Sequence, residues 1–222
     1  GRLVKSDPGN AGWQRDLSLS YTKLGDVRKA QGNLPEALAS HQGSLVIADR
    51  LAKSAPGNAG WQHDLSVSYS KLGDVQAGQG NLPEALTSYR RSQAILDLLA
   101  RADPGNAGWQ RDLSVSYSKL GEVQADQGDL PEALKSYQAH FHIADRLAKS
   151  DPGNAGWQRD LSVSYSNLGA LAVTQGNLPE AAASYEGSHE ILDRLAKSDP
   201  GNADWQRDLS VSYNKIGDVR KA

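Results

Sequence analysis

Apolar positions along the chain repeat with the period of an α-helix. Between residues 58 and 78 they step by three and four, which places them on one helix face, at Trp61, Leu65, Tyr69, Leu72 and Val75 or Gln76. A second stripe follows between residues 82 and 102, at Leu82, Ala85, Leu86, Tyr89, Ile95 or Leu96, and Leu99. No segment shows the sustained alternation of a strand. The pattern predicts a first helix, helix A, and a second helix, helix B, each of roughly 20 residues.

The segment between these helices carries turn and capping signals. Gly80 is expected to end helix A in the left-handed conformation that glycine adopts most easily. Asn81 is expected to cap helix B in a capping box with Glu84, so that losing Asn81 costs about 0.5–2 kcal/mol. Pro83 falls in the first turn of helix B, where a missing N–H is tolerated. Pro104 is expected to end helix B shortly before it, because the residue that precedes a proline disfavours helix.

The same unit returns at a constant step of 48 residues, marked by Trp13, Trp61, Trp109, Trp157 and Trp205. A period of this size is typical of repeat arrays. One helix pair cannot bury both of its apolar faces, so neighbouring units are expected to stack. We therefore predict a single array over residues 1–222. It consists of the end of a preceding helix B (1–6), repeats 7–54, 55–102, 103–150 and 151–198, and the helix A of a fifth repeat (199–222).

Composition narrows the classes of function. Apolar residues make up 38% of the 222 residues, which is enough for a packed core, and the formal net charge is −2. That balance argues against a general nucleic-acid binder, which carries a basic excess. The chain has no cysteine, which excludes disulfides, thiolate catalysis and cysteine-based zinc sites. There is no signal-peptide pattern and no apolar run long enough to span a membrane, so we expect a cytoplasmic protein without membrane partners.

Residues that suggest chemistry have simpler structural interpretations. The loop over residues 7–12 lacks the ligand pattern of a calcium loop and the lysine of a phosphate loop, so it is interpreted as a helix stop, a turn and a cap. His140 and His142 are two residues apart and point to different helix faces. His41 stands where other repeats have a tyrosine such as Tyr89, and is expected to pack between helices. The recurring serines have no recurring His–Asp partner. We expect no enzyme, no cofactor and no metal site.

The second repeat resembles the tetratricopeptide repeat at Tyr69, Leu72, Gly73, Gly80, Ala85 and Tyr89. The third repeat has the same residue types at the equivalent positions, Tyr117, Leu120, Gly121, Gly128, Ala133 and Tyr137. In this family the small residues let two helices approach and the aromatic residues fill the space between them. The unit here is longer than the usual 34 residues and is similar to the long-repeat kinesin light chain class. The resemblance implies an all-α fold, a right-handed superhelical solenoid of stacked antiparallel helix pairs.

The resemblance also implies a groove, lined by the A helices, that receives an extended peptide or a partner helix. The family's groove positions fall on a Leu/Val row, a Lys row and an acidic row. In the fourth repeat the lysine is replaced by asparagine and the acid by alanine. We therefore consider an apolar anchor point there, with sequence drift as the alternative. The candidate groove residues are Leu19, Lys23, Asp26, Val67, Lys71, Asp74, Val115, Lys119, Glu122, Val163, Asn167, Ala170, Val173, Val211, Lys215 and Asp218.

A simpler interpretation of the lysine and acidic rows stays open. Lys71 and Asp74 are three residues apart, so they are expected to form an ordinary exposed ion pair within one helix. A further row, Arg15, His63, Arg111, Arg159 and Arg207, is considered as an addition to the groove from the extended part of helix A. The family's clamp for a C-terminal carboxylate is not present, because each lysine has an acid beside it.

A non-catalytic protein-interaction scaffold, with a protein or peptide as partner and no nucleic acid, is the function that this resemblance implies. One alternative is a self-assembling structural solenoid that associates through uncapped array ends, around Leu209, Tyr213 and Ile216. Another is the sensor arm of a larger multidomain signalling protein.

Overall fold

A computed structural model describes residue 7 and residues 9–222 of the chain. The described residues form nine helices and no strand. The A helices are α2 (Ala11–Ala30), α4 (Ala59–Gly78), α6 (Ala107–Asp126), α8 (Ala155–Thr174) and α10 (Ala203–Lys221). The B helices are α3 (Leu34–Ser54), α5 (Leu82–Ala102), α7 (Leu130–Ser150) and α9 (Leu178–Ser198). The predicted end of a preceding helix B over residues 1–6 lies outside the described residues.

The helix boundaries agree with the sequence prediction to within a residue or so in the second repeat. The chain divides into two compact units, which meet between Trp109 and Gln110. Within the described part of the chain, no helix is both long and apolar enough to cross a membrane.

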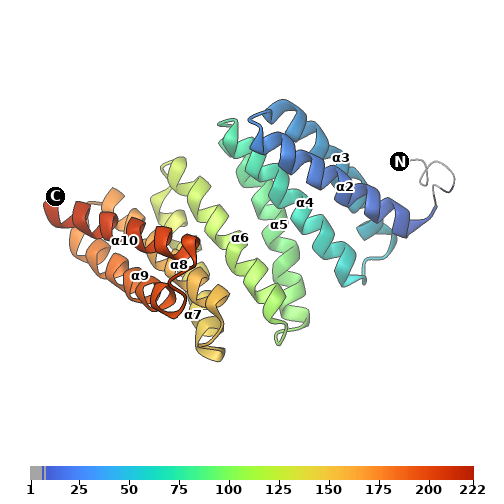
Figure 1. Ribbon diagram of the computed structural model, residues 1–222. Coiled ribbons are helices and arrows are strands. Elements are labelled where there is room, and N and C mark those ends of the chain that lie inside the picture. Colours follow the sequence, from blue (N-terminus) through green and yellow to red (C-terminus); the bar gives the residue numbers. More distant parts are fainter. Residues whose placement is uncertain (1–6, 8) are drawn as a thin grey trace. The chain divides into compact units, whose positions relative to one another are not determined.

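The first unit contains α2 to α5, which run up and down as consecutive antiparallel helices (Figure 1). Each of these helices packs on the next one along the chain. A core cluster of Ala48, Ala52 and Leu65 joins α3 to α4, and Ile95 of α5 packs against it. A helix B is therefore packed between two A helices, which buries both of its faces.

The second unit contains most of α6, followed by α7 to α10, and repeats this arrangement. One core cluster of this unit combines Ala144 and Ala148 of α7, Leu161 of α8, and three residues of α9, Ile191, Leu192 and Leu195. Trp157 and Trp205 are half-buried against this cluster. The tryptophans that mark the repeat thus cover the core rather than filling it.

The turn between helix A and helix B has the predicted glycine geometry. Gly32, Gly80, Gly128 and Gly176 have φ angles of +79°, +79°, +80° and +75°, the left-handed region that other residues enter only with strain. In the second repeat the amide of Gly80 donates to Ala77 O and the amide of Asn81 donates to Gln76 O, both at 2.9 Å. These bonds satisfy the last carbonyls of α4, as at many helix ends.

The predicted capping box at Asn81 is wrong. The Asn81 side chain accepts no hydrogen bond from helix α5. Where the equivalent bond forms, from Glu132 N to Asp129 and from Glu180 N to Asn177, the distance is 3.4 Å, at the edge of hydrogen-bonding range. The turn holds the cap residue too far from the amide for a strong hydrogen bond. The loss of stability predicted for removing the Asn81 side chain is therefore no longer expected.

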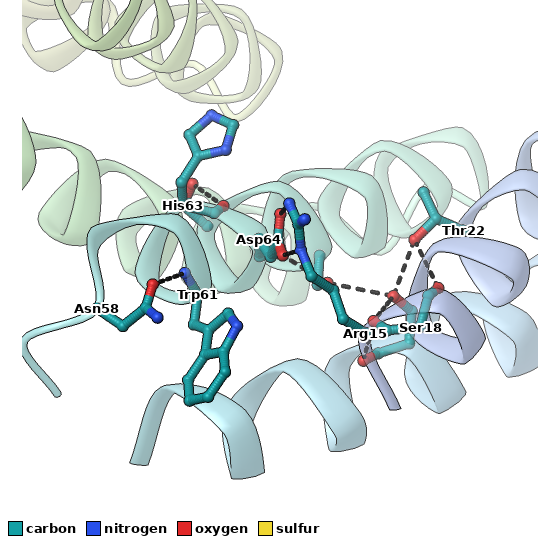
Figure 2. Close-up of polar contacts among 10 residues, drawn as sticks. Arg15, Ser18, Thr22, Asn58, Trp61, His63 and Asp64 are labelled. Carbon is teal, nitrogen blue, oxygen red and sulfur yellow. Dashed lines mark hydrogen bonds and ion pairs between the residues drawn. The ribbon is translucent and has the colours of Figure 1, made fainter. Parts of the chain in front are cut away.

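The asparagines that begin the A helices do cap them. Asn58 accepts a hydrogen bond of 3.1 Å from Trp61 N, and Figure 2 shows this bond closing the loop onto α4. The same bond, 3.0–3.2 Å long, recurs in all the other repeats, at Asn10, Asn106, Asn154 and Asn202. The predicted cap at the start of α2 is thus confirmed at Asn10, whereas Pro8 lies outside the described residues.

Helix A and helix B of one repeat approach closely at a glycine. A Cβ atom added at Gly73 would lie 2.7 Å from the ring of Tyr89, and one at Gly121 would lie 2.5 Å from the ring of Tyr137. In the first repeat the ring is that of His41, only 1% exposed, against Gly25. The predicted packing of His41 between helices is therefore confirmed.

Candidate functional site

The apolar row of candidate groove residues lies on the surface of the A helices. Leu19, Val115, Val163 and Val211 are between 38% and 46% exposed, and Val67 is half-buried. These side chains lie on the helix face opposite the core, so the packing of the core does not depend on them. A row of exposed apolar side chains at equivalent positions is a contact surface that a partner can cover.

Lys71 of the lysine row pairs with the acid of the preceding repeat, not with the acid of its own helix. Lys71 Nζ lies 2.9 Å from Asp26 Oδ1, which joins α4 to α2. The predicted pair of Lys71 with Asp74, three residues on, is therefore wrong for Lys71. The carboxylate of Asp74 instead accepts a hydrogen bond of 2.8 Å from the hydroxyl of Tyr89. In the acidic row, Asp74 thus accepts from the tyrosine of its own repeat, and Asp26 pairs with the lysine of the next repeat.

The arginine row forms a second set of bonds between repeats. Arg15 binds Asp64 through two bonds, Nε–Oδ2 at 2.5 Å and Nη2–Oδ1 at 3.2 Å (Figure 2). Arg111 with Asp160 and Arg159 with Asp208 repeat this pair in the second unit. These hydrogen bonds raise the pKa of the arginines, because they stabilise the charged guanidinium.

This role was not predicted from the sequence, where the arginines were considered only as an extension of the groove. The signal was present in the chain, since an arginine is followed 49 residues later by an aspartate in each pair.

The recurring serines pack the helices together. Ser18 Oγ lies 2.9 Å from Ser44 Oγ, and Ser44 Oγ lies 3.2 Å from Ser68 Oγ, so buried hydroxyls link α2, α3 and α4. Figure 2 shows Ser18 with Thr22, whose hydroxyl also lies 2.8 Å from Ser44 Oγ. In the second unit His189 Nδ1 lies 3.0 Å from Ser212 Oγ, but no carboxylate of the described residues bonds to this imidazole. Ser18, Ser44 and Ser68 thus bond to one another, and Ser212 also donates to the backbone oxygen of Leu209 at 2.6 Å.

His140 and His142 lie on different faces of helix α7. His140 is 2% exposed, and burial lowers its pKa to about 4. His142 is exposed, so the two point to different faces as predicted. Across the described residues, no three His, Asp or Glu side chains gather where they could hold a metal ion.

A recess between α8 and α10 brings four of the candidate residues together. It has a volume of about 220 Å³ and is lined by Val163 and Asn167 of α8 and by Val211 and Lys215 of α10. Arg159 and Asp208, paired at 2.7 Å, close one side of it. Apolar and polar groups therefore alternate around a space large enough for a side chain.

The fourth repeat changes the polar contacts beside this recess. Asn167, in place of lysine, donates from Nδ2 to Ser118 Oγ of α6 at 2.9 Å. Lys215 Nζ lies over the ring of Tyr185, 5.3 Å from its centroid, and burial lowers the pKa of this lysine. Such a cation–π contact attracts the ammonium but leaves it without a counter-charge.

The apolar stretch at residues 170–173 is only half on the surface. Ala170 and Val173 are exposed, whereas Leu171 and Ala172 are 3% and 2% exposed and belong to the core. The remaining candidates, Lys23, Lys119, Glu122 and Asp218, lie on A helices outside the recess.

A different kind of recess lies where the loop between repeats meets helix B. In the second unit it has a volume of about 240 Å³ and is lined by Pro152, Gly153 and Arg194 among others. In the first unit its counterpart is lined by Pro56, Gly57 and Leu98, and its volume is about 360 Å³. Leu98 is 68% exposed, so the leucine gives this recess an apolar rim, which was not predicted from the sequence.

Comparison with known proteins agrees with this architecture. A family model of the tetratricopeptide repeat matches residues 67–91, 115–135 and 162–186. No curated protein sequence matches the chain. The crystal structure of BtubC (BKLC) from P. vanneervenii is similar over 100% of this chain and 80% of that one, with 19% identity and a TM-score of 0.69. The crystal structure of MamA covers 88% of this chain and 86% of its own at 18% identity, with a TM-score of 0.49. The likeness to BtubC confirms the predicted fold class, an all-α solenoid of stacked helix pairs.

Proposed function

Because this chain is a tetratricopeptide-like repeat protein, we propose that it is a non-catalytic protein-interaction scaffold that binds an extended peptide or a partner helix on its A helices. The fold supports a scaffold in general terms, since stacked repeats present extended surfaces to partners. The chemistry of the site supports it too, because the buried hydroxyls and imidazoles serve packing, and the polar surface groups form ion pairs between repeats.

The observation that carries the proposal is the recess between α8 and α10. Four residues chosen from sequence as groove residues, Val163, Asn167, Val211 and Lys215, line this one space. Val163 and Val211 are 42% and 46% exposed, so a partner side chain that covers them removes apolar surface from water, which favours binding by roughly 25 cal/mol per Å².

Selection of peptides by display on the purified 222-residue protein tests this proposal. Peptides that survive selection are synthesised, and their affinities are measured by isothermal titration calorimetry. The variant V163D/V211D should weaken their binding at least tenfold, because two carboxylates then enter the apolar part of the recess and must be desolvated. Val46→Asp on α3 is the control, since Val46 is 65% exposed and lies outside the recess.

Circular dichroism of both variants is the control that checks whether their helices are retained. The proposal is supported if the recess variant loses affinity and the control keeps it. It is contradicted if no peptide is enriched, or if the two variants lose affinity equally.

A further inference from the structure

The second unit lacks two charges that complete an ion-pair pattern in the first. In the first unit Lys71 of α4 pairs at 2.9 Å with Asp26, the acid of the preceding helix A. The equivalent acid in α8 is Ala170 and the equivalent lysine is Asn167. Helix α8 therefore offers no carboxylate to the lysine of α10 and no ammonium to the acid of α6.

The lysine of α10 is Lys215, whose ammonium lies over an aromatic ring and has no counter-charge within the described residues. Its ammonium forms no ion pair with any described residue, and lies 5.3 Å from the centre of the Tyr185 ring. In the second repeat the equivalent tyrosine, Tyr89, donates its hydroxyl to Asp74 at 2.8 Å. In the fourth repeat that acid is Ala170, so Tyr185 and Lys215 have both lost the carboxylate that this position supplies elsewhere.

The charges nearest to Lys215 do not replace the missing carboxylate. Arg159 and Asp208 line the same recess but neutralise one another at 2.7 Å. Asp218, three residues further along α10, is exposed and forms no ion pair with Lys215 within the described residues. The charge of Asp218 adds to the effect of burial in raising the pKa of Tyr185. Asp218 therefore lies near enough to weaken the binding of an incoming anion. The ammonium is the uncompensated charge of the recess lining.

The acid of α6 is Glu122, which lacks a lysine partner because the fourth repeat has Asn167 at the position of that lysine. Glu122 is exposed, and no basic residue of the described chain pairs with it. The residue that would have been its lysine, Asn167, is bonded instead to Ser118 Oγ at 2.9 Å. The second unit thus carries an ammonium without an ion pair, Lys215, on α10 and a carboxylate without one, Glu122, on α6. The exposed Ala170 and Val173 lie on α8, the A helix between α6 and α10 in the chain.

We propose that this surface binds an extended peptide segment whose acidic side chain replaces the missing carboxylate at Lys215 and Tyr185, and whose basic side chain binds Glu122. An apolar residue of the segment lies between them on Ala170 and Val173. The proposal rests on the proposed scaffold function and names the partner's chemistry. Neighbouring packed helices lie about 8–10 Å apart, so two steps span roughly 20 Å, which an extended chain at about 3.3 Å per residue covers in about six residues.

A synthetic peptide with blocked termini tests this, carrying a glutamate and a lysine about six positions apart around a leucine. Matched peptides have glutamine in place of the glutamate or of the lysine. Titration against the full chain should give an affinity about three- to tenfold weaker for each neutral peptide. The difference should shrink in 1 M salt, where exposed charges are screened.

Substitutions that restore the pattern are the sharpest arm of the experiment. Ala170→Asp supplies Lys215 and Tyr185 with an internal carboxylate, so it should lower the affinity of the glutamate peptide to that of its glutamine counterpart. Asn167→Lys supplies Glu122 with an internal ammonium, so it should lower the affinity of the lysine-containing peptide to that of its glutamine counterpart. Asp218→Asn removes a negative charge that weakens an incoming anion, so it should strengthen binding. Lys149→Gln on α7 is the charge control, because it removes one ammonium outside the recess and should leave the affinity unchanged.

The outcomes separate this inference from the function on which it rests. If the charged and neutral peptides bind equally, and V163D/V211D still removes their binding, the scaffold function stands and the charge-pairing inference is overturned. An unchanged affinity in the Ala170→Asp variant overturns it as well. If none of the peptides binds at millimolar concentration, the inference and the groove of the proposed function both fail.

Discussion

Arg15 on α2 and Asp64 on α4 form a two-bond ion pair between consecutive A helices, with Nε–Oδ2 at 2.5 Å and Nη2–Oδ1 at 3.2 Å. The carboxylate is 15% exposed and the guanidinium 47% exposed. The same pair recurs in the second unit between Arg111 and Asp160. This geometry fixes how far one A helix can slide along the next, because both bonds form at a single offset.

A double-mutant cycle of Arg15→Gln and Asp64→Asn should therefore give a coupling energy of about 0.5–1 kcal/mol in urea denaturation, at the upper end for pairs that are partly exposed. The coupling should fall in 1 M salt. The pair of Lys53 with Asp49, four residues apart on α3, is the comparison and should couple more weakly. Equal couplings in the two cycles would show that the pair between helices has no special role.

The close approach at Gly121 leads to a second prediction. A Cβ atom at this position would lie 2.5 Å from the ring of Tyr137, so Gly121→Ala should lower the free energy of unfolding by about 1–3 kcal/mol through overpacking. Gly217, the equivalent residue of α10, has no atom within 4 Å of such a Cβ. Gly217→Ala should therefore stabilise the protein by up to about 1 kcal/mol, the difference in helix propensity. Thermal and urea unfolding measure both, and the same sign for the two variants would contradict the packing argument.

Much of the fold could be predicted from the sequence because its signals are local. Helix A and helix B follow from apolar spacing, and the turn between them follows from Gly80, whose φ angle of +79° suits glycine. The close approach of Gly73 to Tyr89 followed from the family resemblance. Asn81 shows the limit of this reasoning, because capping residues in the right order do not guarantee that the turn brings their atoms within bonding distance.

Partners between helices could not be predicted in the same way. The sequence places Lys71 three residues from Asp74, yet its ammonium binds Asp26. That choice depends on the offset between stacked A helices, which no pattern within one repeat contains. The candidate groove was predicted as a set of equivalent positions, and four of them do line one recess. The unpaired charge of Lys215 emerges only when the pairing rule between repeats is known.

His41 supplies a third prediction. Its imidazole is 1% exposed, and neither ring nitrogen has a hydrogen-bond partner. Tyr89, at the equivalent position, bonds to Asp74 at 2.8 Å. His41→Tyr should restore this bond to Asp26 and raise the free energy of unfolding by about 1 kcal/mol. Tyr89→Phe is the converse variant and should lower stability by a similar amount. A destabilised His41→Tyr protein would mean that the first repeat is shaped around the smaller ring.

Stability should also depend on pH through His140. Burial lowers its pKa from 6.5 to about 4, against the smaller opposing effect of the Asp160 charge. Between these two values the unfolded chain binds the proton and the folded chain does not. The contribution of His140 is therefore fully present above about pH 6.5 and is lost as the pH falls towards 4, by about 3 kcal/mol in total at 1.36 kcal/mol per pKa unit.

The variant that isolates this effect is His140→Ser, because the equivalent residues of the other repeats are Ser44, Ser92 and Ser188. Carboxylates titrate in the same range, so the informative quantity is the difference in pH dependence between the native protein and the variant. Urea denaturation at pH 7.5 and at pH 4.5 should show a smaller loss of stability for His140→Ser. The pKa of His140, followed by the NMR shift of its imidazole, should lie well below 6.5. Parallel pH profiles for the two proteins would mean that His140 accepts its proton in the folded state as readily as in the unfolded chain.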